Sequence, residues 1–288
     1  MITGKFDYVA AGTVDEALAL LRRHGDGAKL LAGGHSLIPL MKLRLAQPEV
    51  LVDITRIPGL GEIRPSNGGL AIGATCTYRQ IAESPALREA APVLGQAAGG
   101  IGDPLVRNRG TIGGNLAHAD PASDLPAVAL ALDAELVARG PGGERRIAAG
   151  DFFTGMLATA LGPDELLTEI RIRRLGPGTG SAYRKFDQPA SRYAIVGVAA
   201  VVRLEGGRVA DAAVGITGAG ERAVRATRVE SALRGQAASD EAIARAAEAA
   251  SEGITFLGDI HASADYRRHL TRVYTRRALE AAVRAAGG

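Results

Sequence analysis

Cysteine is almost absent from this sequence of 288 residues, in which Cys76 is the single example. One cysteine cannot form an intramolecular disulfide, and it cannot supply the ligands of an iron–sulfur cluster or of a cysteine-rich zinc site. Lysine is scarce too, because only four of the 34 basic residues are lysines, namely Lys5, Lys29, Lys42 and Lys185. We therefore predict that the chain holds no metal centre of its own and has few candidates for a catalytic lysine.

Long apolar runs are missing as well. The longest, residues 193–202, is half the ~20 residues that a membrane-spanning helix needs. Residues 1–11 contain Lys5 and Asp7 and no apolar core of a signal peptide. We therefore expect a cytoplasmic protein, free or associated with the inner face of the membrane. The net charge of +3 is spread along the chain, so it does not predict binding to nucleic acid.

The phosphate-binding fingerprints of the common nucleotide folds are also missing. Gly4-Lys5 is followed by Phe6, so the chain has no Gly-x-x-x-x-Gly-Lys-Ser/Thr loop. Residues 218–223 approach the dinucleotide fingerprint, but a Rossmann fold would need a helix and then another parallel strand after them. The chain instead continues into helices to its end. We interpret this segment as a turn.

The first unit, residues 1–55, is predicted to be a compact βαβ-like piece. Thr13 and Glu16 form a capping-box pattern at the start of an amphipathic helix that Gly25 ends. Short apolar strands are expected at 29–32 and 50–53, with a short helix at 37–43 between them.

The second unit, residues 56–176, mixes strands with helices. Strands are expected at 69–73, 134–138 and 166–172, and helices at 78–82, 85–98 and 125–132. The segment 103–115 is polar and contains glycine, and the apolar helix at 125–132 follows it. The Gly- and Pro-rich segment 174–180 is the best candidate for a linker in the chain.

The third unit, residues 177–288, is predicted to be an α+β domain. Strands are expected at 181–186, 193–204 and 208–216, with a hairpin turn at 205–207, and helices at 227–233, 240–250 and 265–286. Strands followed by helices indicate a three-stranded antiparallel sheet with helices on one face.

Two of the seven glycine pairs stand out by their surroundings, although about five pairs are expected by chance at this composition. The first, in Ala32–Ser36, lies between an apolar strand and a short helix. The second, in Thr111–Asn115, precedes the helix at 125–132. A diphosphate needs close main-chain approach, several N–H donors and a helix N-terminus. Two such loops can hold it from both sides, and ordinary turns are the alternative.

Two other clusters have simple explanations. His118, Asp120 and Asp124 would form a poor metal cage, and a loop with capping aspartates explains them. Asp124 is alternatively suited to accept hydrogen bonds from ribose hydroxyls, as acidic residues do in other nucleotide sites. A row of arginines at 268, 272 and 276 follows one face of the last helix. Such a row is usually solvated, with a partner-binding face as the alternative.

The two glycine-pair segments also resemble a known family. Residues 32–44 (AGGHSLIPLMKLR) and 107–126 (RNRGTIGGNLAHADPASDLP) are similar to the two FAD-binding motifs of the flavoprotein subunit of the xanthine dehydrogenase, or molybdenum hydroxylase, family. The similarity is greatest to the medium subunit of aerobic carbon monoxide dehydrogenases, and it covers the whole chain. Two long motifs in the right order and at the right spacing make the resemblance specific.

The resemblance implies an α+β fold, with an FAD-binding domain of the vanillyl-alcohol-oxidase (PCMH) type in two subdomains, 1–55 and 56–176, and a C-terminal flavoprotein domain, 177–288. In that family the two loops hold the FAD diphosphate through main-chain amides, an acidic residue matching Asp124 contacts ribose, and Tyr193 lies where relatives place a residue against the flavin. Residues 187–192 depart from the commoner family pattern. The implied cofactor-binding residues are Leu31, Ala32, Gly33, Gly34, His35, Ser36, Leu37, Ile101, Thr111, Ile112, Gly113, Gly114, Asn115, Asp124, Leu167, Lys185 and Tyr193.

The resemblance also implies partners. In such complexes a molybdopterin cofactor on a large subunit oxidises the substrate, and two [2Fe–2S] clusters on a small subunit pass the electrons to FAD. This chain would carry that FAD and deliver the electrons to an external acceptor, in a heterohexamer built as a dimer of heterotrimers. The lone Cys76 agrees with this division, and no residue here is assigned as catalytic because the flavin does the chemistry.

Two alternatives are a free-standing flavin oxidoreductase that acts directly on a small substrate and a non-catalytic nucleotide-binding module. The free-standing enzyme would need a substrate cap with aromatic or acid/base residues. An aromatic content of 4% supplies such a cap poorly.

Overall fold

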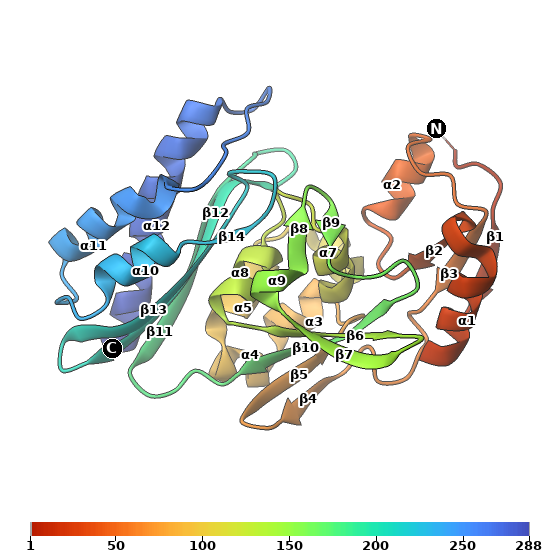
Figure 1. Cartoon of the computed structure of the whole chain (residues 1–288), viewed down its shortest axis with the longest axis horizontal. Coiled ribbons are helices and arrows are strands. Elements are labelled where there is room, and N and C mark those ends of the chain that lie inside the picture. The colour runs from red at the N-terminus through yellow and green to blue at the C-terminus, as the bar shows by residue number, and fades with distance from the viewer. Residues whose placement is uncertain (1, 288) are drawn as a thin grey trace.

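The computed structural model describes residues 2–287. The chain runs through three consecutive parts, which follow one another along the long axis of the molecule (Figure 1). In this described range no helix combines the length and the apolar character that crossing a membrane requires.

The N-terminal part is a three-stranded parallel sheet of order β1-β3-β2 with one long helix packed on it. The Thr13 side chain accepts a hydrogen bond from the Glu16 N–H at 3.1 Å, so the helix starts where the capping pattern predicted. The predicted elements are confirmed here, and β1 is an addition. The elements are β1 (Asp7–Ala10), α1 (Val14–His24), the short 3-10 helix η1 (Gly25–Gly27), β2 (Ala28–Leu31), α2 (Leu37–Lys42) and β3 (Val50–Asp53).

The middle part is a five-stranded antiparallel sheet of order β4-β5-β10-β6-β7 with short helices packed on it. Its strands are β4 (Ile63–Ser66), β5 (Gly69–Gly73), β6 (Glu135–Gly140), β7 (Gly143–Ala148) and β10 (Leu166–Arg173). Its helices are α3 (Tyr78–Glu83), α4 (Pro85–Ala90), α5 (Pro92–Gly99), α6 (Pro104–Arg109), α7 (Ile112–His118), α8 (Leu125–Ala131) and α9 (Ala149–Phe152). A small hairpin, β8 (Phe153–Gly155) and β9 (Ala158–Thr159), follows α9.

One prediction for the middle part is wrong, and two of its helices were not predicted. The single helix expected at 85–98 is two helices, because Ala91 leaves the helical region (φ −156°, ψ 77°) before Pro92, as steric clash with a following proline favours. The polar segment 103–115 contains α6 and the start of α7, which begin at the caps Asp103 and Thr111. Both helices are shorter than the window over which apolar periodicity can be recognised.

The C-terminal part is an antiparallel sheet of order β11-β12-β13-β14 with three helices. The three predicted strands are present, and the expected hairpin turn joins the second to the third through residues 206–207. The predicted three-stranded sheet is corrected to four strands, because the two-residue strand β14 pairs with the end of β13 and is too short for a sequence pattern to reveal. The elements are β11 (Thr179–Asp187), β12 (Ala194–Glu205), β13 (Arg208–Thr217), β14 (Val224–Arg225), α10 (Thr227–Leu233), α11 (Asp240–Glu248), the 3-10 helix η2 (Ala249–Ser251) and α12 (Ala264–Gly287).

The C-terminal sheet is buried on both faces, and this joins two cores. Side chains alternate between the faces of a strand. Val198 and Ala200 of β12 pack in the core shared with α10, α11 and α12, while Ala199 and Val201 pack in the core of the middle part. The backbone of α8 approaches so closely that a Cβ on Gly215 would lie 2.0 Å from the Ala127 carbonyl oxygen. Residues of β12 and β13 are therefore fixed against the middle part, and α5 contacts β11 as well (Figure 1).

Candidate functional site

A cavity of about 640 Å³ lies between the N-terminal and middle parts of the chain. Its walls come from the segment β2–α2, the α6–α7 region, the residues before and within the start of β10, and the loop between β11 and β12. This volume is in the range of sites for small molecules and cofactors. The site-lining residues implied by the sequence resemblance all lie on this cavity except Ile112 and Lys185.

The first predicted loop forms a row of free main-chain donors. Strand β2 ends at Leu31, the chain turns through Gly34 with φ +75°, and α2 begins at Leu37. Within residues 2–287 the N–H groups of Gly33 to Leu37 donate to no protein acceptor. Successive N–H groups in a turn that leads into a helix form a concave binding site for anions. This loop can therefore hold a diphosphate.

The second predicted loop is the first turn of its own helix, α7. Thr111 caps it, since its hydroxyl oxygen accepts from the Gly114 N–H at 3.2 Å. The N–H groups of Ile112 and Gly113 donate to main-chain carbonyls of the segment before α3, at 3.0 and 2.8 Å. Most amides of this loop are thus already bonded within the protein. What the loop offers the cavity is the small, exposed Gly114 and the Asn115 side chain.

Asn115 carries an unpaired polar atom at the cavity wall. Its side-chain NH₂ donates to the Tyr78 hydroxyl at 2.8 Å, and its Oδ1 is buried without a hydrogen-bond partner among the described residues. A buried polar atom without a partner is costly, and in native proteins it usually has an explanation such as a missing ligand. The atom therefore supports a polar occupant of the cavity.

The first loop packs against the residues just before the second loop. A Cβ built on Gly33 would lie 2.1 Å from the Arg109 carbonyl oxygen and 2.9 Å from the Gly110 Cα. The main chain of the first loop therefore packs directly on the segment that leads into the second. Residues of both loops line the same cavity.

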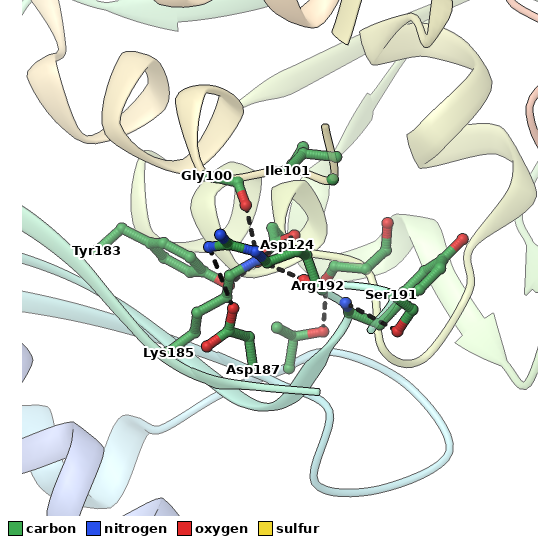
Figure 2. Close-up of polar contacts among 12 residues, drawn as sticks. Gly100, Ile101, Asp124, Tyr183, Lys185, Asp187, Ser191 and Arg192 are labelled. Carbon is green, nitrogen blue, oxygen red and sulfur yellow. Dashed lines mark hydrogen bonds and ion pairs between the residues drawn. The ribbon is translucent and has the colours of Figure 1, made fainter. Parts of the chain in front are cut away.

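Asp124 stands at the start of α8 and is 3% exposed. The Tyr183 hydroxyl donates to its Oδ1 at 2.5 Å, and the Lys185 Nζ lies 3.1 Å from the same oxygen (Figure 2). Burial raises the pKa of the Asp124 carboxyl, and the Lys185 ammonium and the Tyr183 hydroxyl act in the opposite direction. Both partners come from β11 of the C-terminal part, and the carboxylate keeps free acceptor sites for a ligand.

Tyr193 ends the loop between β11 and β12, lines the cavity and is 43% exposed. Main-chain bonds close this loop on itself, from the Gln188 N–H to the Tyr193 carbonyl at 2.9 Å and from the Arg192 N–H to the Gln188 carbonyl at 2.8 Å. The phenol is thus presented to the cavity by a closed loop.

Several cavity residues were not predicted. Tyr78, His118 and Asp120 line the cavity close to the second loop, and residues 159–166 form the wall on the side of β10. The segment 159–166 carries no motif, so only the packed fold reveals its position. His118 and Asp120 lie inside the recognised motif, where proximity to Asn115 was the available signal.

The other sequence clusters have structural explanations. No group of three or more His, Cys, Asp or Glu side chains in the described part of the chain could hold a metal ion. Gly218 is in a turn (φ +79°) in which its N–H donates to Pro121. Each arginine of the row on α12 pairs with a neighbouring carboxylate, the pairs being Arg268–Asp265, Arg272–Glu248 and Arg276–Glu280.

Comparison with known families agrees with this geometry. Residues 4–174 match the model of the FAD-binding domain in molybdopterin dehydrogenases, and residues 181–282 match the carbon monoxide dehydrogenase flavoprotein C-terminal domain. The chain belongs to this flavoprotein family. One similar member is the carbon monoxide dehydrogenase medium chain of Hydrogenophaga pseudoflava, 42% identical over 98% of both chains. Another is the 6-hydroxypseudooxynicotine dehydrogenase complex subunit alpha of Paenarthrobacter nicotinovorans, 41% identical over 98% of this chain and 95% of that one.

Solved structures extend the similarity to the whole fold of this flavoprotein. A chain of carbon monoxide dehydrogenase from Hydrogenophaga pseudoflava has a TM-score of 0.96 at 44% identity and is covered to 98%, as is this chain. A chain of carbon monoxide dehydrogenase from Oligotropha carboxidovorans also has a TM-score of 0.96, at 38% identity, with 99% of this chain and all of that chain covered. The recognised resemblance and the α+β fold class are therefore confirmed, and the chain is an FAD-dependent dehydrogenase subunit.

Proposed function

We propose that this flavoprotein binds one FAD in the cavity and passes electrons from [2Fe–2S] clusters of a small partner subunit to an external acceptor. The observation that carries the proposal is the row of free amides at Gly33–Leu37, packed directly on the second motif. FAD supplies the ability to take up and release electrons singly or in pairs. A chain with one buried cysteine cannot hold the clusters, so a partner must.

The proposed roles of the residues follow from their positions. The Gly33–Leu37 amides hold the diphosphate, Asn115 supplies a further polar contact, and the free lone pairs of Asp124 accept hydrogen bonds from cofactor hydroxyls. Ile101, Leu167 and Tyr193 give the cavity the apolar and aromatic surfaces that the rings of FAD need. These residues bind and orient the cofactor. We assign no general acid or base among them.

The proposed assembly contains a large subunit with the molybdopterin cofactor and a small subunit with two [2Fe–2S] clusters. It is a dimer of heterotrimers. We place it in the cytoplasm, free or at the inner face of the membrane. Family membership supports the multi-subunit arrangement, since relatives carry names such as medium chain, medium subunit and complex subunit. The enzyme names of these relatives also contain different compounds, namely carbon monoxide, nicotine and glyceraldehyde. Such variety around one flavoprotein fold supports substrate selection on another subunit.

We also propose the domain boundaries 1–55, 56–176 and 177–288. Three clusters of buried side chains support them, one built mainly from residues 11–60, one mainly from 70–172 and one from 182–282. The middle cluster also includes four residues of the C-terminal sheet, Tyr183, Ala199, Val201 and Ala213. This sharing supports a tightly joined second and third domain.

The test is purification of the tagged chain with its co-purifying subunits. The expected result is a yellow protein with about one FAD per chain, reduced when the substrate of the complex is added and reoxidised by an acceptor. Bound flavin that no partner can reduce would favour the non-catalytic module. An isolated chain that oxidises a substrate unaided would favour the free-standing oxidoreductase. Absence of FAD from both chain and complex would contradict the proposal.

A further inference from the structure

Four large apolar side chains are exposed to solvent around the end of α2 and on α6. They are Ile2, Leu43, Leu45 and Leu105, which are between 51% and 81% exposed. Contacts join their segments, because a Cβ on Gly4 would lie 2.8 Å from the Arg44 guanidinium, and the His35 ring nitrogen lies 3.3 Å from the Leu105 carbonyl oxygen. The end of α2 lies beside the N-terminus at one edge of the molecule (Figure 1). Single exposed apolar residues are ordinary, whereas a group of them marks an interaction surface.

The two leucines at the end of α2 are held in place by an ordered turn. The Leu43 N–H donates to the Pro39 carbonyl at 3.0 Å, and the Leu45 N–H donates to the Leu40 carbonyl at 2.9 Å. Arg44 between them has φ +64°, a left-handed conformation that costs free energy for a residue other than glycine. The exposure of both leucines is therefore a property of the fixed fold and does not come from a loose chain.

Cations accompany the four apolar side chains. Lys42, Arg44 and Arg109 are exposed, and none of them forms an ion pair within the described chain. Residues 37–48 and 104–109 contain no Asp or Glu. These seven side chains form the α2–α6 patch. Apolar side chains with a charged rim are typical of protein interfaces, and unpaired cations favour a partner that carries carboxylates opposite them.

The α2–α6 patch adjoins the cavity through the same two helices. Leu40 of α2 and Val106 of α6 line the cavity, whereas Leu43, directly after α2, and Leu105 of α6 are exposed to solvent and do not line it. A helix with its side chains is about 10–12 Å across. A partner bound to the patch would therefore lie about one helix diameter from the cavity.

We propose that the α2–α6 patch is a docking surface for the small subunit that carries the [2Fe–2S] clusters. In the proposed electron path the clusters reduce FAD directly, so the subunit that holds them must approach the cavity. The large subunit exchanges electrons with the small subunit in that path and needs no contact beside FAD. The small subunit should meet the patch with apolar side chains and carboxylates around them. The inference rests on the proposed function, which supplies the identity of the partner.

The test replaces Leu43 and Leu45 together with aspartate in the tagged, purified complex. Neither residue lines the cavity, so the variant should keep its FAD. In a dilution series it should release the small subunit, measured as protein and as iron per FAD, at protein concentrations at least about a hundredfold higher than the wild type does. The reason is that the interface would bury two unpaired carboxylates. Ile260→Asp is the control, because Ile260 is 95% exposed on the segment before α12, and this variant should keep the small subunit.

Release of the small subunit at the wild-type concentration would overturn the inference. Loss of the large subunit alone, or loss only of self-association between copies of this chain, would also overturn it. If the double variant fails to keep FAD, Lys42→Glu decides, since Lys42 is exposed and does not line the cavity. Docking predicts weaker retention of the small subunit at low salt, with a difference from the wild type that added salt reduces, and unchanged retention refutes it. A wild-type complex whose flavin stays oxidised when its clusters are reduced would instead refute the proposed function.

Discussion

Replacing Gly33 with alanine should push the first loop away from the segment that leads into the second. The new Cβ would lie 2.1 Å from the Arg109 carbonyl oxygen, where ordinary van der Waals contact begins at 3.4 Å. The position of the Cβ is fixed by the main chain of residue 33 and the oxygen belongs to the main chain of Arg109, so no flexible side chain can move aside. The loops must separate by about 1.3 Å, the difference between these two distances.

The size of the effect follows from the cost of overpacking. Forcing an extra methyl group into a closely packed contact costs about 1–3 kcal/mol. Without cofactor the two loops can relax apart, but binding requires them to close again, so most of this strain falls on the bound state. At about tenfold per 1.4 kcal/mol, we expect the Gly33→Ala variant to bind FAD roughly 5- to 150-fold more weakly than the wild type.

The assay measures the FAD-to-protein ratio from the visible absorbance of the purified protein, followed by titration of the FAD-free form. Gly176→Ala is the matched control, because a Cβ there meets no atom within 4 Å. The control should bind FAD like the wild type. If Gly33→Ala retained FAD with wild-type affinity and an unchanged melting temperature, the close loop contact would not govern the site.

Three further predictions test other parts of the structure. Gly114→Leu should abolish FAD retention, measured by visible absorbance, because Gly114 is exposed toward the cavity. Its melting temperature should also fall, because a Cβ there would lie 2.8 Å from the Thr111 hydroxyl oxygen that caps α7. Cys76 is fully buried, and burial raises the pKa of its thiol to about 11. The thiol should therefore stay protonated at pH 8 and react with iodoacetamide only after the protein is unfolded. Rapid labelling of the native protein would contradict this prediction. Thr217→Val should lower the free energy of unfolding by about 1–3 kcal/mol, because the buried Thr217 hydroxyl donates to the Pro121 and Ser123 carbonyls just before Asp124. Urea denaturation measures this loss.

The local signals in the sequence predicted the first loop well. Gly33 and Gly34 follow a short apolar strand and precede a helix, and this order alone indicates a turn with exposed amides. The strand, the turn with positive φ at Gly34 and the helix from Leu37 are all present. The capping pattern at Thr13 and the hairpin before β13 were equally local, and they too were correct.

Features that depend on tertiary packing were not predictable in this way. Nothing in the sequence around Thr111 indicates that the Ile112 and Gly113 amides donate to carbonyls of the segment before α3. The start of α7 directly after Thr111 was not indicated either. The position of Lys185 behind the wall depends on how β11 packs against α5 and α8. Residues 159–166 form the cavity wall on the side of β10 only because the hairpin β8–β9 folds back beside α7.

The most direct test of the account is an experimental structure of the protein with FAD bound. We expect the diphosphate oxygens of FAD to lie within hydrogen-bond distance of the Gly33–Leu37 amides, on the side of this loop that faces α7. An FAD whose diphosphate lies away from these amides, or that occupies another region of the chain, would contradict the central claim.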